Sequence, residues 1–328
     1  MERKKAGLQC AAAGIGLLVL IFDGARALEG AQTGIQLCIT TVIPSLFPFF
    51  VLSILFTSSL DNFCNPKLQI LSKYMGIPPA AASILFPAVL GGYPVGAKAV
   101  GDLYRNHRIT KAEAEHLLSF CSNAGPSFIF GMVSGFFPER KTIWVLWFIH
   151  IFSVFLTALS IPVEKEKTED SFSPESTDGQ AIIWSAAKAM CLVCCWVILF
   201  RMVITFLNAW LLWILPVWLQ VLLKGFLELT NGCCDLLLIS DIHLRFVLCS
   251  CMLSFGGVCV LLQTVGVTKG LGLSGYLKGK CLQTAFSFLL SCALVWQYGF
   301  FLLTAIPIFL ILLRKTQNRY RNPRMIPV

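Results

Sequence analysis

Charged side chains are scarce in this sequence of 328 residues. Asp, Glu, Lys and Arg together make up 13% of it, whereas hydrophobic residues make up 56% and the mean hydropathy is +0.76. A soluble globular domain carries about 25% charged residues, so this composition excludes one. The chain has room for roughly eight to ten membrane-entering segments of about 20 residues. We therefore expect an all-α, polytopic membrane protein.

Motifs for several kinds of chemistry are absent from the sequence. It contains no Gly-x-x-x-x-Gly-Lys-Ser/Thr phosphate loop, which argues against a nucleotide-driven pump, and no His-Glu-x-x-His zinc helix. Its four histidines are scattered along the chain. A soluble basic face of the kind that binds nucleic acid is also missing. We expect no enzymatic activity, no cofactor, no metal site and no nucleic-acid partner.

The 14 cysteines do not predict a disulfide framework, because most of them lie within apolar runs. Free cysteine in such a run behaves as a small buried hydrophobe. Cys191 and Cys194 have the Cys-x-x-Cys spacing of redox and metal sites, but no second pair or histidine cluster accompanies them. We therefore expect these cysteines to be buried structural residues and not a redox or metal site.

The N-terminal residues 1–27 combine a basic start, an apolar run and the sequence Ala25-Arg26-Ala27. That order resembles a signal peptide with a small-x-small cleavage site. Because further apolar segments follow at once, we favour an uncleaved transmembrane helix and keep the signal peptide as the alternative. Pro44 and Pro48 predict a kink in the next span, residues 28–60.

Two apolar helices of the first half are interrupted by turn-forming residues, at 91–96 and at 122–126. Backbone in hydrocarbon must satisfy its own N–H and C=O groups, so such breaks survive only inside protein or beside a wet cavity. Secondary transporters use broken helices near the bilayer midplane to hold a solute. Residues 78–106 predict a re-entrant helical hairpin, and a Thr110–Glu113 capping box predicts the start of the second broken helix.

The second half repeats this organisation after a span at 141–163 and an acidic, polar stretch at 164–180. Spans are expected at about 181–207, 209–223 (kinked at Pro216), 275–296 and 299–313. Between them lie a polar break at 227–232 and a re-entrant stretch at 243–267. Clusters of basic residues at both ends of the chain favour cytoplasmic termini.

An offset of 165 residues places Gly91-Gly92 over Gly256-Gly257 and Lys98 over Gln263. The same offset places Gly101 over Gly266. Matching broken helices in two halves of a chain indicate an inverted-repeat transporter fold. The alternative is a coincidence among the 25 glycines of the sequence.

Four motifs resemble one known family: GGYPVGAK at 91–98, SFCSNAGPSFIFG at 119–131, LELTNG at 227–232 and SFGGVCVLLQ at 254–263. From about residue 43 to 297 the chain resembles sporulation integral membrane proteins of the YlbJ type, in the nucleoside-recognition or Gate-domain superfamily. The resemblance implies two inverted repeats with re-entrant hairpins and broken helices. These would be related to the core of concentrative nucleoside transporters and to the membrane part of the ferrous-iron transporter FeoB. It also implies a role in spore envelope maturation, without naming a substrate.

The expected organisation follows from the breaks and from this resemblance. It comprises an N-terminal transmembrane helix (1–27), a first Gate-like repeat (28–163), an acidic linker (164–180), a second Gate-like repeat (181–313) and a basic tail (314–328). The expected location is the bacterial plasma membrane, or the forespore or mother-cell membrane. The expected partners are the lipid bilayer, a small polar solute and a second copy in a homo-oligomer.

Polar groups beside the breaks are the candidate site. Lys98 is either functional or paired with Asp102 on its own helix. Glu228 is a carboxylate at membrane depth, which could hold a cation or a proton or could neutralise Lys98. The glycines shape the site, whereas amides and hydroxyls contact either solute or freed backbone. The candidates are Gly91, Gly92, Tyr93, Pro94, Lys98, Asn123, Gly125, Pro126, Glu228, Thr230, Asn231, Ser254, Gly256, Gly257 and Gln263.

Two hypotheses about function remain open at this stage. The first is a transporter-like protein that moves or senses a small polar solute, coupled to a proton or a sodium ion. The second is a non-transporting membrane scaffold for assembly of the spore cortex or coat. They differ in whether Lys98, Asn123, Glu228 and Gln263 line one cavity.

Overall fold

The computed structural model describes residues 2–60, 75, 77–161 and 179–295, and these residues are helical with short connections. The first half contains α1 (Glu2–Phe22), α2 (Gly24–Leu37), α3 (Ile43–Leu60), α5 (Leu85–Leu90), α6 (Val95–Arg105), α7 (Lys111–Leu118) and α8 (Arg140–Ser160). The second half contains α9 (Gly179–Trp210), α10 (Val217–Leu227), α11 (Leu229–Cys234), α12 (Ile242–Phe255), α13 (Gly257–Val267) and α14 (Ser274–Val295).

Short stretches of π-helix and 3-10 helix join these helices. The π-helical turns are Cys38–Val42 and Ser127–Met132. The 3-10 turns are Pro79–Ile84, Val133–Phe136, Leu212–Ile214 and Asp235–Leu238.

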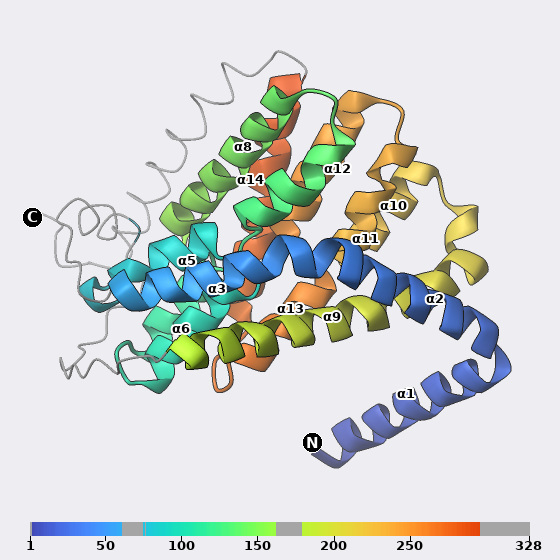
Figure 1. Ribbon diagram of the computed structural model, residues 1–328, viewed down its shortest axis with the longest axis horizontal. Coiled ribbons are helices and arrows are strands. Elements are labelled where there is room, and N and C mark those ends of the chain that lie inside the picture. The colour runs from blue at the N-terminus through green and yellow to red at the C-terminus, as the bar shows by residue number, and fades with distance from the viewer. Residues whose placement is uncertain (1, 61–74, 76, 162–178, 296–328) are drawn as a thin grey trace, which may run out of the picture.

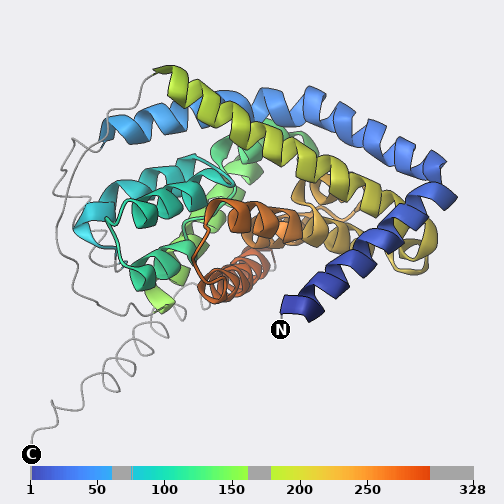
Figure 2. The ribbon, with the colours of Figure 1, turned by 90° about the horizontal axis from the view of Figure 1, so that it is seen from below.

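Two groups of helices make up the body of the protein. The helix α14 packs between α8 and α12 in one group, while α2 packs lengthwise along α9 in the other (Figure 1). In the second view the blue α2–α3 rod and the yellow-green α9 run together along one side, above the short helices of the breaks (Figure 2). The breaks are therefore enclosed between the two groups.

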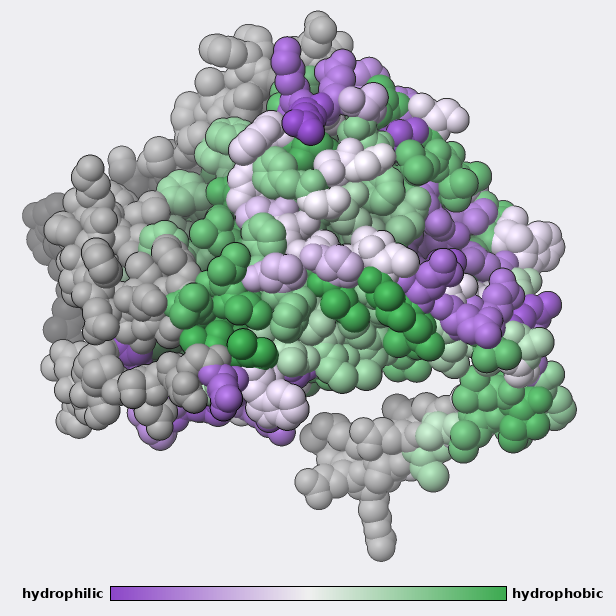
Figure 3. Space-filling model, viewed as in Figure 1, coloured by the Kyte–Doolittle hydropathy of each residue, from purple (hydrophilic) through white to green (hydrophobic). Residues whose placement is uncertain are grey.

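Four helical stretches in the described residues are long and apolar enough to cross a membrane: Gly24–Leu52, Arg140–Ser160, Gln180–Trp210 and Ile242–Val267. Large apolar side chains point outward from them, including Trp144, Phe148 and Trp184, each more than half exposed. The space-filling view shows a hydrophobic band across the front face, with hydrophilic residues gathered at the top of the view, at the right, and below the band at the lower left (Figure 3). These features are those of an integral membrane protein.

Local sequence signals set several helix ends as predicted. The Thr110 hydroxyl accepts a hydrogen bond from the Glu113 N–H, and the Glu113 carboxylate accepts one from the Thr110 N–H, which confirms the capping box that starts α7. The predicted span at 141–163 corresponds to α8. Before Pro44 the chain widens into the π-helical turn Cys38–Val42, because a proline ring clashes with the carbonyl group four residues earlier.

Other boundaries differ from the prediction. The span expected at 209–223 is interrupted at Pro216, where a kink was predicted, but α9 continues to Trp210 and α10 covers Val217–Leu227. The helix α1 lies within the expected N-terminal helix of residues 1–27 and includes the apolar stretch Ala13–Phe22. The basic tail, the expected span at 299–313 and most of the acidic linker lie outside the described residues.

Pairs of glycines allow the helices to approach closely. Gly30 and Gly34 lie one turn apart on α2, where an added Cβ would be 2.8 Å from the Met202 Cα and 2.9 Å from the Ile198 Cα of α9. On α14, Gly279 lies directly against the Ser119 carbonyl group at the end of α7. Small residues at this spacing are typical of packed helices in membranes.

Candidate functional site

The first and second breaks touch each other through glycine backbone. Gly92 has φ +71° and lies in the turn between α5 and α6, which starts at Gly91, the C-cap of α5, and includes Pro94, the N-cap of α6. A Cβ on Gly125, in the second break, would be 2.9 Å from both the N and the Cα of Gly92. Only glycine leaves room for this contact, so the two predicted breaks of the first half form one unit.

A third break, from the second half, joins them through Tyr93. The helix α12 ends at Gly256, whose φ of +83° is the left-handed conformation that favours glycine at a helix C-terminus. The Tyr93 hydroxyl donates a hydrogen bond of 2.9 Å to the Leu253 carbonyl group in the last turn of α12. A Cβ at Gly256 would lie 2.8 Å from that hydroxyl, so Gly256 is needed for space as well as for conformation.

Lys280 of α14 lies at the centre of this convergence and is 1% exposed. Its Nζ donates to the Gln283 Oε1 at 2.9 Å, to the Ser254 carbonyl oxygen at 3.2 Å and to the Tyr93 hydroxyl at 3.4 Å. Gln283 in turn donates from Nε2 to the Asn123 Oδ1 at 3.1 Å. We call these five residues, Tyr93, Asn123, Ser254, Lys280 and Gln283, the Lys280 cluster.

Several buried polar groups near the Lys280 cluster have few hydrogen-bond partners in the described part of the chain. The Ser254 hydroxyl and both ring nitrogens of His150 make no hydrogen bond there, and His150 lies within electrostatic range of Lys280. The Tyr276 hydroxyl faces the Ser122 and Thr264 hydroxyls, and these three groups have no other hydrogen-bond partner among the described residues. Buried polar groups in native proteins usually have partners, so this concentration marks the place as unusual.

A second polar cluster occupies the break between α10 and α11. The Glu228 carboxylate accepts hydrogen bonds from the Thr230 N–H at 3.1 Å, from the Asn231 N–H at 2.8 Å and from the Asn231 Nδ2 at 2.7 Å. Arg201 of α9 donates from Nη1 to the Asn231 Oδ1 at 2.8 Å. Asn231 therefore bridges a guanidinium group and a carboxylate, and we call these four residues the Glu228 cluster.

The glycine pair 256–257 lies between the two clusters. Gly256 faces Tyr93, whereas a Cβ on Gly257 would lie 3.1 to 3.4 Å from the carbonyl oxygens of residues 225–227, at the end of α10. An open cavity of about 550 Å³ is lined by residues that belong to neither cluster. Its lining is Thr40, Thr41, Pro44, Ser45, Gly131, Met132, Phe136 and Cys234.

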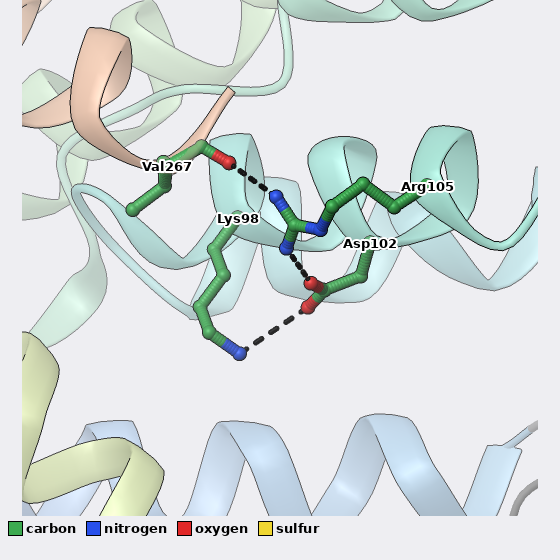
Figure 4. A network of polar contacts seen from close by, with 4 residues as sticks. All are labelled: Lys98, Asp102, Arg105 and Val267. Carbon is green, nitrogen blue, oxygen red and sulfur yellow. Dashed lines mark hydrogen bonds and ion pairs between the residues drawn. The ribbon is translucent and has the colours of Figure 1, made fainter. Parts of the chain in front are cut away.

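Lys98 is not part of either cluster. Its Nζ lies 3.2 Å from the Asp102 Oδ2 on the same helix, and its side chain is 32% exposed (Figure 4). Asp102 also pairs with Arg105, which donates to the Val267 carbonyl group at the end of α13. No ion pair joins Lys98 to Glu228 among the described residues, and each is held by neighbours on its own segment.

The four residues expected to line one cavity have different surroundings. Lys98 pairs with Asp102, Asn123 belongs to the Lys280 cluster and Glu228 to the Glu228 cluster. Gln263 donates from Nε2 to the Cys259 Sγ, one turn earlier on α13. The structure thus separates the predicted candidates into two buried clusters and a half-exposed ion pair, with Pro126 half-buried at the start of the Ser127–Met132 turn.

Lys280, Gln283 and Arg201 were not among the predicted site residues. The lysine and the arginine within expected spans are signals in themselves, since ionisable groups at membrane depth are costly and usually functional. These three residues lie within the unbroken helices α9 and α14, away from the turn-forming residues that define the predicted site. No group of three or more His, Cys, Asp or Glu side chains suited to a metal ion occurs in the described residues.

Comparison with known proteins gives one segmental similarity. The sporulation integral membrane protein YlbJ of Bacillus subtilis (strain 168) is 34% identical to this chain over 116 residues, which is 34% of this chain and 28% of the relative. No protein-family model matches the chain, and no solved structure matches it. The match spans less than a third of the relative's length. The chain is therefore a polytopic helical membrane protein, part of which is similar to a sporulation membrane protein.

Proposed function

We propose that this protein binds a small polar solute at the Lys280 cluster, moves or senses it there, and acts in spore formation. The observation that carries the proposal is the convergence of polar groups from both sides of the acidic linker. Tyr93 and Asn123 come from the first half, and Ser254, Lys280 and Gln283 come from the second. An apolar core would hold the helices together at lower cost, because burying a polar group is unfavourable even when it is paired.

The groups around the cluster indicate the class of solute. The hydroxyls of Ser122, Thr264 and Tyr276 offer donors and acceptors beside the Lys280 cluster, and among the described residues no carboxylate lies within 4 Å of Lys280. A solute that carries several hydroxyl or carbonyl groups, neutral or anionic, suits this set. Cations are disfavoured by the charge of Lys280.

The similarity to a sporulation integral membrane protein supports the part of the proposal that concerns spores. The Gate-domain relationship and the two inverted repeats belong to the same proposal. Their support is the offset of 165 residues between the two glycine pairs, each of which lies at a helix break. Coupling to a proton or a sodium ion stays an expectation of this proposal.

A scaffold for spore envelope assembly is the second candidate, and one observation favours it. Lys98, Asn123, Glu228 and Gln263 do not share one cavity, and the groups of the Lys280 cluster bond to one another. Such a closed network could serve rigidity alone. The two candidates differ in whether the polar cluster itself is needed once the protein has folded and reached the membrane.

Complementation of a gene deletion in the native spore-forming host separates the candidates. The measurement is heat-resistant spore yield with wild type, Lys280→Met, Asn123→Leu or the matched control Lys278→Met, whose side chain is exposed on the same helix. Membrane levels of each variant are measured by immunoblot. We expect the cluster variants to reach the membrane and fail to restore spores, while Lys278→Met restores them.

Other outcomes decide against parts of the proposal. Full rescue by Lys280→Met and Asn123→Leu would favour the scaffold, and a deletion without a spore defect would remove the role in sporulation. Solute binding is tested on the purified protein by thermal unfolding with nucleosides, polyols and amino acids, because a bound ligand raises the midpoint. A shift that wild type and Lys278→Met share and Lys280→Met lacks is the expected result. The same shift in all three proteins would place solute binding elsewhere.

A further inference from the structure

The ammonium group of Lys280 lies within a shell of oxygen atoms from three separate elements. Gln283 of α14, the Ser254 carbonyl group of α12 and the Tyr93 hydroxyl of the first break accept hydrogen bonds of 2.9, 3.2 and 3.4 Å. An ammonium group has three N–H donors, so each acceptor matches one donor. The Nζ also lies 5.1 Å from the centroid of the Tyr93 ring.

Two of the three oxygens, those of Gln283 and Tyr93, are turned toward Lys280 by the other hydrogen bonds of their own residues. Gln283 uses its Nε2 to donate to the Asn123 Oδ1, which leaves Oε1 for the ammonium group. Tyr93 gives its hydroxyl proton to the Leu253 carbonyl group, which leaves the oxygen lone pairs for the ammonium group. The orientation of these acceptors therefore does not depend on Lys280 alone.

Asn123 fixes the far end of this arrangement. Its Nδ2 donates to the Ala88 carbonyl group at 3.1 Å and to the Phe120 carbonyl group at 2.6 Å. Its Oδ1 must then face Gln283. The two amides thus form a chain of hydrogen bonds in one direction: Asn123 donates to backbone carbonyl groups, Gln283 donates to Asn123, and Lys280 donates to Gln283. The Gln283 oxygen therefore faces the ammonium group.

The end of α12 adds a further attraction for positive charge. The Ser254 carbonyl group lies in the last turn of that helix, where carbonyl groups lack partners within the helix and the dipole is negative. The Tyr93 ring provides a negative face. Within the described residues no carboxylate lies within 4 Å of Lys280 Nζ, so neutral oxygens and dipoles hold the charge.

We infer that these oxygens form a monovalent-cation site that the chain fills with its own lysine ammonium group. The site accepts a small monovalent cation. In the native protein this cation is the ammonium group of Lys280, which is covalently part of the chain. Free sodium is excluded from this position while the Lys280 side chain is present. The inference concerns the site and its occupant, and its test measures stability, so it can fail while the proposed function stands.

The test replaces the tethered cation with a free one. Lys280→Ala removes the equivalent of a propylammonium group, and the purified full-length protein in detergent is unfolded by heat with propylammonium chloride, sodium chloride or choline chloride at equal ionic strength. Wild type and Lys278→Ala serve as controls, since Lys278 is exposed two residues away. A neutral analogue, 1-propanol, tests filling of the cavity alone.

We expect Lys280→Ala to lower the unfolding midpoint by about 5 °C or more, because three oriented acceptors lose their donors. Propylammonium should recover about 2–4 °C of this loss in Lys280→Ala and nothing in the controls. Sodium should recover less, and choline, which has no N–H group, none. Equal recovery by 1-propanol, or no recovery by any cation, would overturn the inference.

A second pair of variants keeps the test decisive if Lys280→Ala does not fold. Gln283→Leu removes an oxygen from the shell at similar volume, whereas Gln283→Glu keeps an oxygen and adds negative charge. A site built for a cation should make Gln283→Glu the more stable of the two, despite the cost of burying a carboxylate. The opposite order of unfolding midpoints would contradict a cation site.

Discussion

Gln283 donates a hydrogen bond of 3.1 Å from its Nε2 to the Oδ1 of Asn123, across 160 residues of sequence. Both side chains are at most 1% exposed. Through this bond an unbroken helix of the second half, α14, is joined to a helix break of the first half. The bond also links two sets of contacts, because Asn123 donates to backbone carbonyl groups and Gln283 accepts from Lys280.

Removing either amide should destabilise the protein, and removing both should cost less than the sum. Asn123→Leu and Gln283→Leu should each lower the free energy of unfolding by about 1–3 kcal/mol, because the partner amide is left buried without its hydrogen bond. Their interaction energy in a double-mutant cycle should be about 0.5–3 kcal/mol. Denaturant or thermal unfolding in detergent measures it. As a control, Asn123→Leu should be additive with Gln36→Leu, an exposed position on α2.

Gly279 should not tolerate a methyl group. A Cβ at this position would overlap the Ser119 carbonyl oxygen, so Gly279→Ala must push α14 away from α7, at a cost of about 1–3 kcal/mol or more. Gly266→Ala is the matched control, because the nearest atom to its added Cβ is 3.9 Å away. That substitution should leave stability unchanged or raise it by up to about 1 kcal/mol through helix propensity. Similar unfolding midpoints for the two variants would contradict the close approach of α7 and α14.

Glu228→Gln should be destabilising even though the two side chains have nearly the same shape. Three N–H groups donate to the Glu228 carboxylate, so an amide would place its NH₂ group against one of these donors. The expected loss is about 1–3 kcal/mol, measured by thermal unfolding. Glu139→Gln is the control, since Glu139 is exposed at the start of α8 and makes no side-chain capping bond. Glu228 is the N-cap of α11, and equal stability of both variants would show that its carboxylate does not stabilise the start of that helix.

Lys98→Met should change stability by less than about 0.5 kcal/mol. The Lys98–Asp102 pair is half-exposed and lies on one helix, and such pairs contribute little. Spore yield and the unfolding midpoint should both match wild type. A loss as large as that of Lys280→Met would mean that Lys98 acts in a conformation other than the one described.

The helix breaks were predictable because their cause is local. Glycine pairs at 91–92 and 256–257 supply the positive φ angles that interrupt a helix, and three of these four glycines adopt them. The Thr110–Glu113 capping box was predictable for the same reason. These signals come from residues within a few positions of one another, so they do not depend on how the helices pack.

The partners of the candidate residues could not be predicted from the sequence. Lys278 and Lys280 look alike in an apolar span, yet they lie about 200° apart around a helix of 3.6 residues per turn. Packing alone decides that Lys280 faces Tyr93 and that Lys278 faces outward. The partners of Lys98 and Glu228 could not be predicted either. Sequence spacing allowed each of them a local partner as well as a partner in the other half of the chain.

The span of the bonds in the Lys280 cluster has a consequence for how the protein is made. Tyr93 and Asn123 leave the ribosome 187 and 160 residues before the partners that they meet in the finished protein. During synthesis these two polar groups therefore enter the membrane without Lys280 or Gln283. The helix α14 is the element that closes the cluster, and the order of translation makes its arrival the last step in assembling the protein's polar interior.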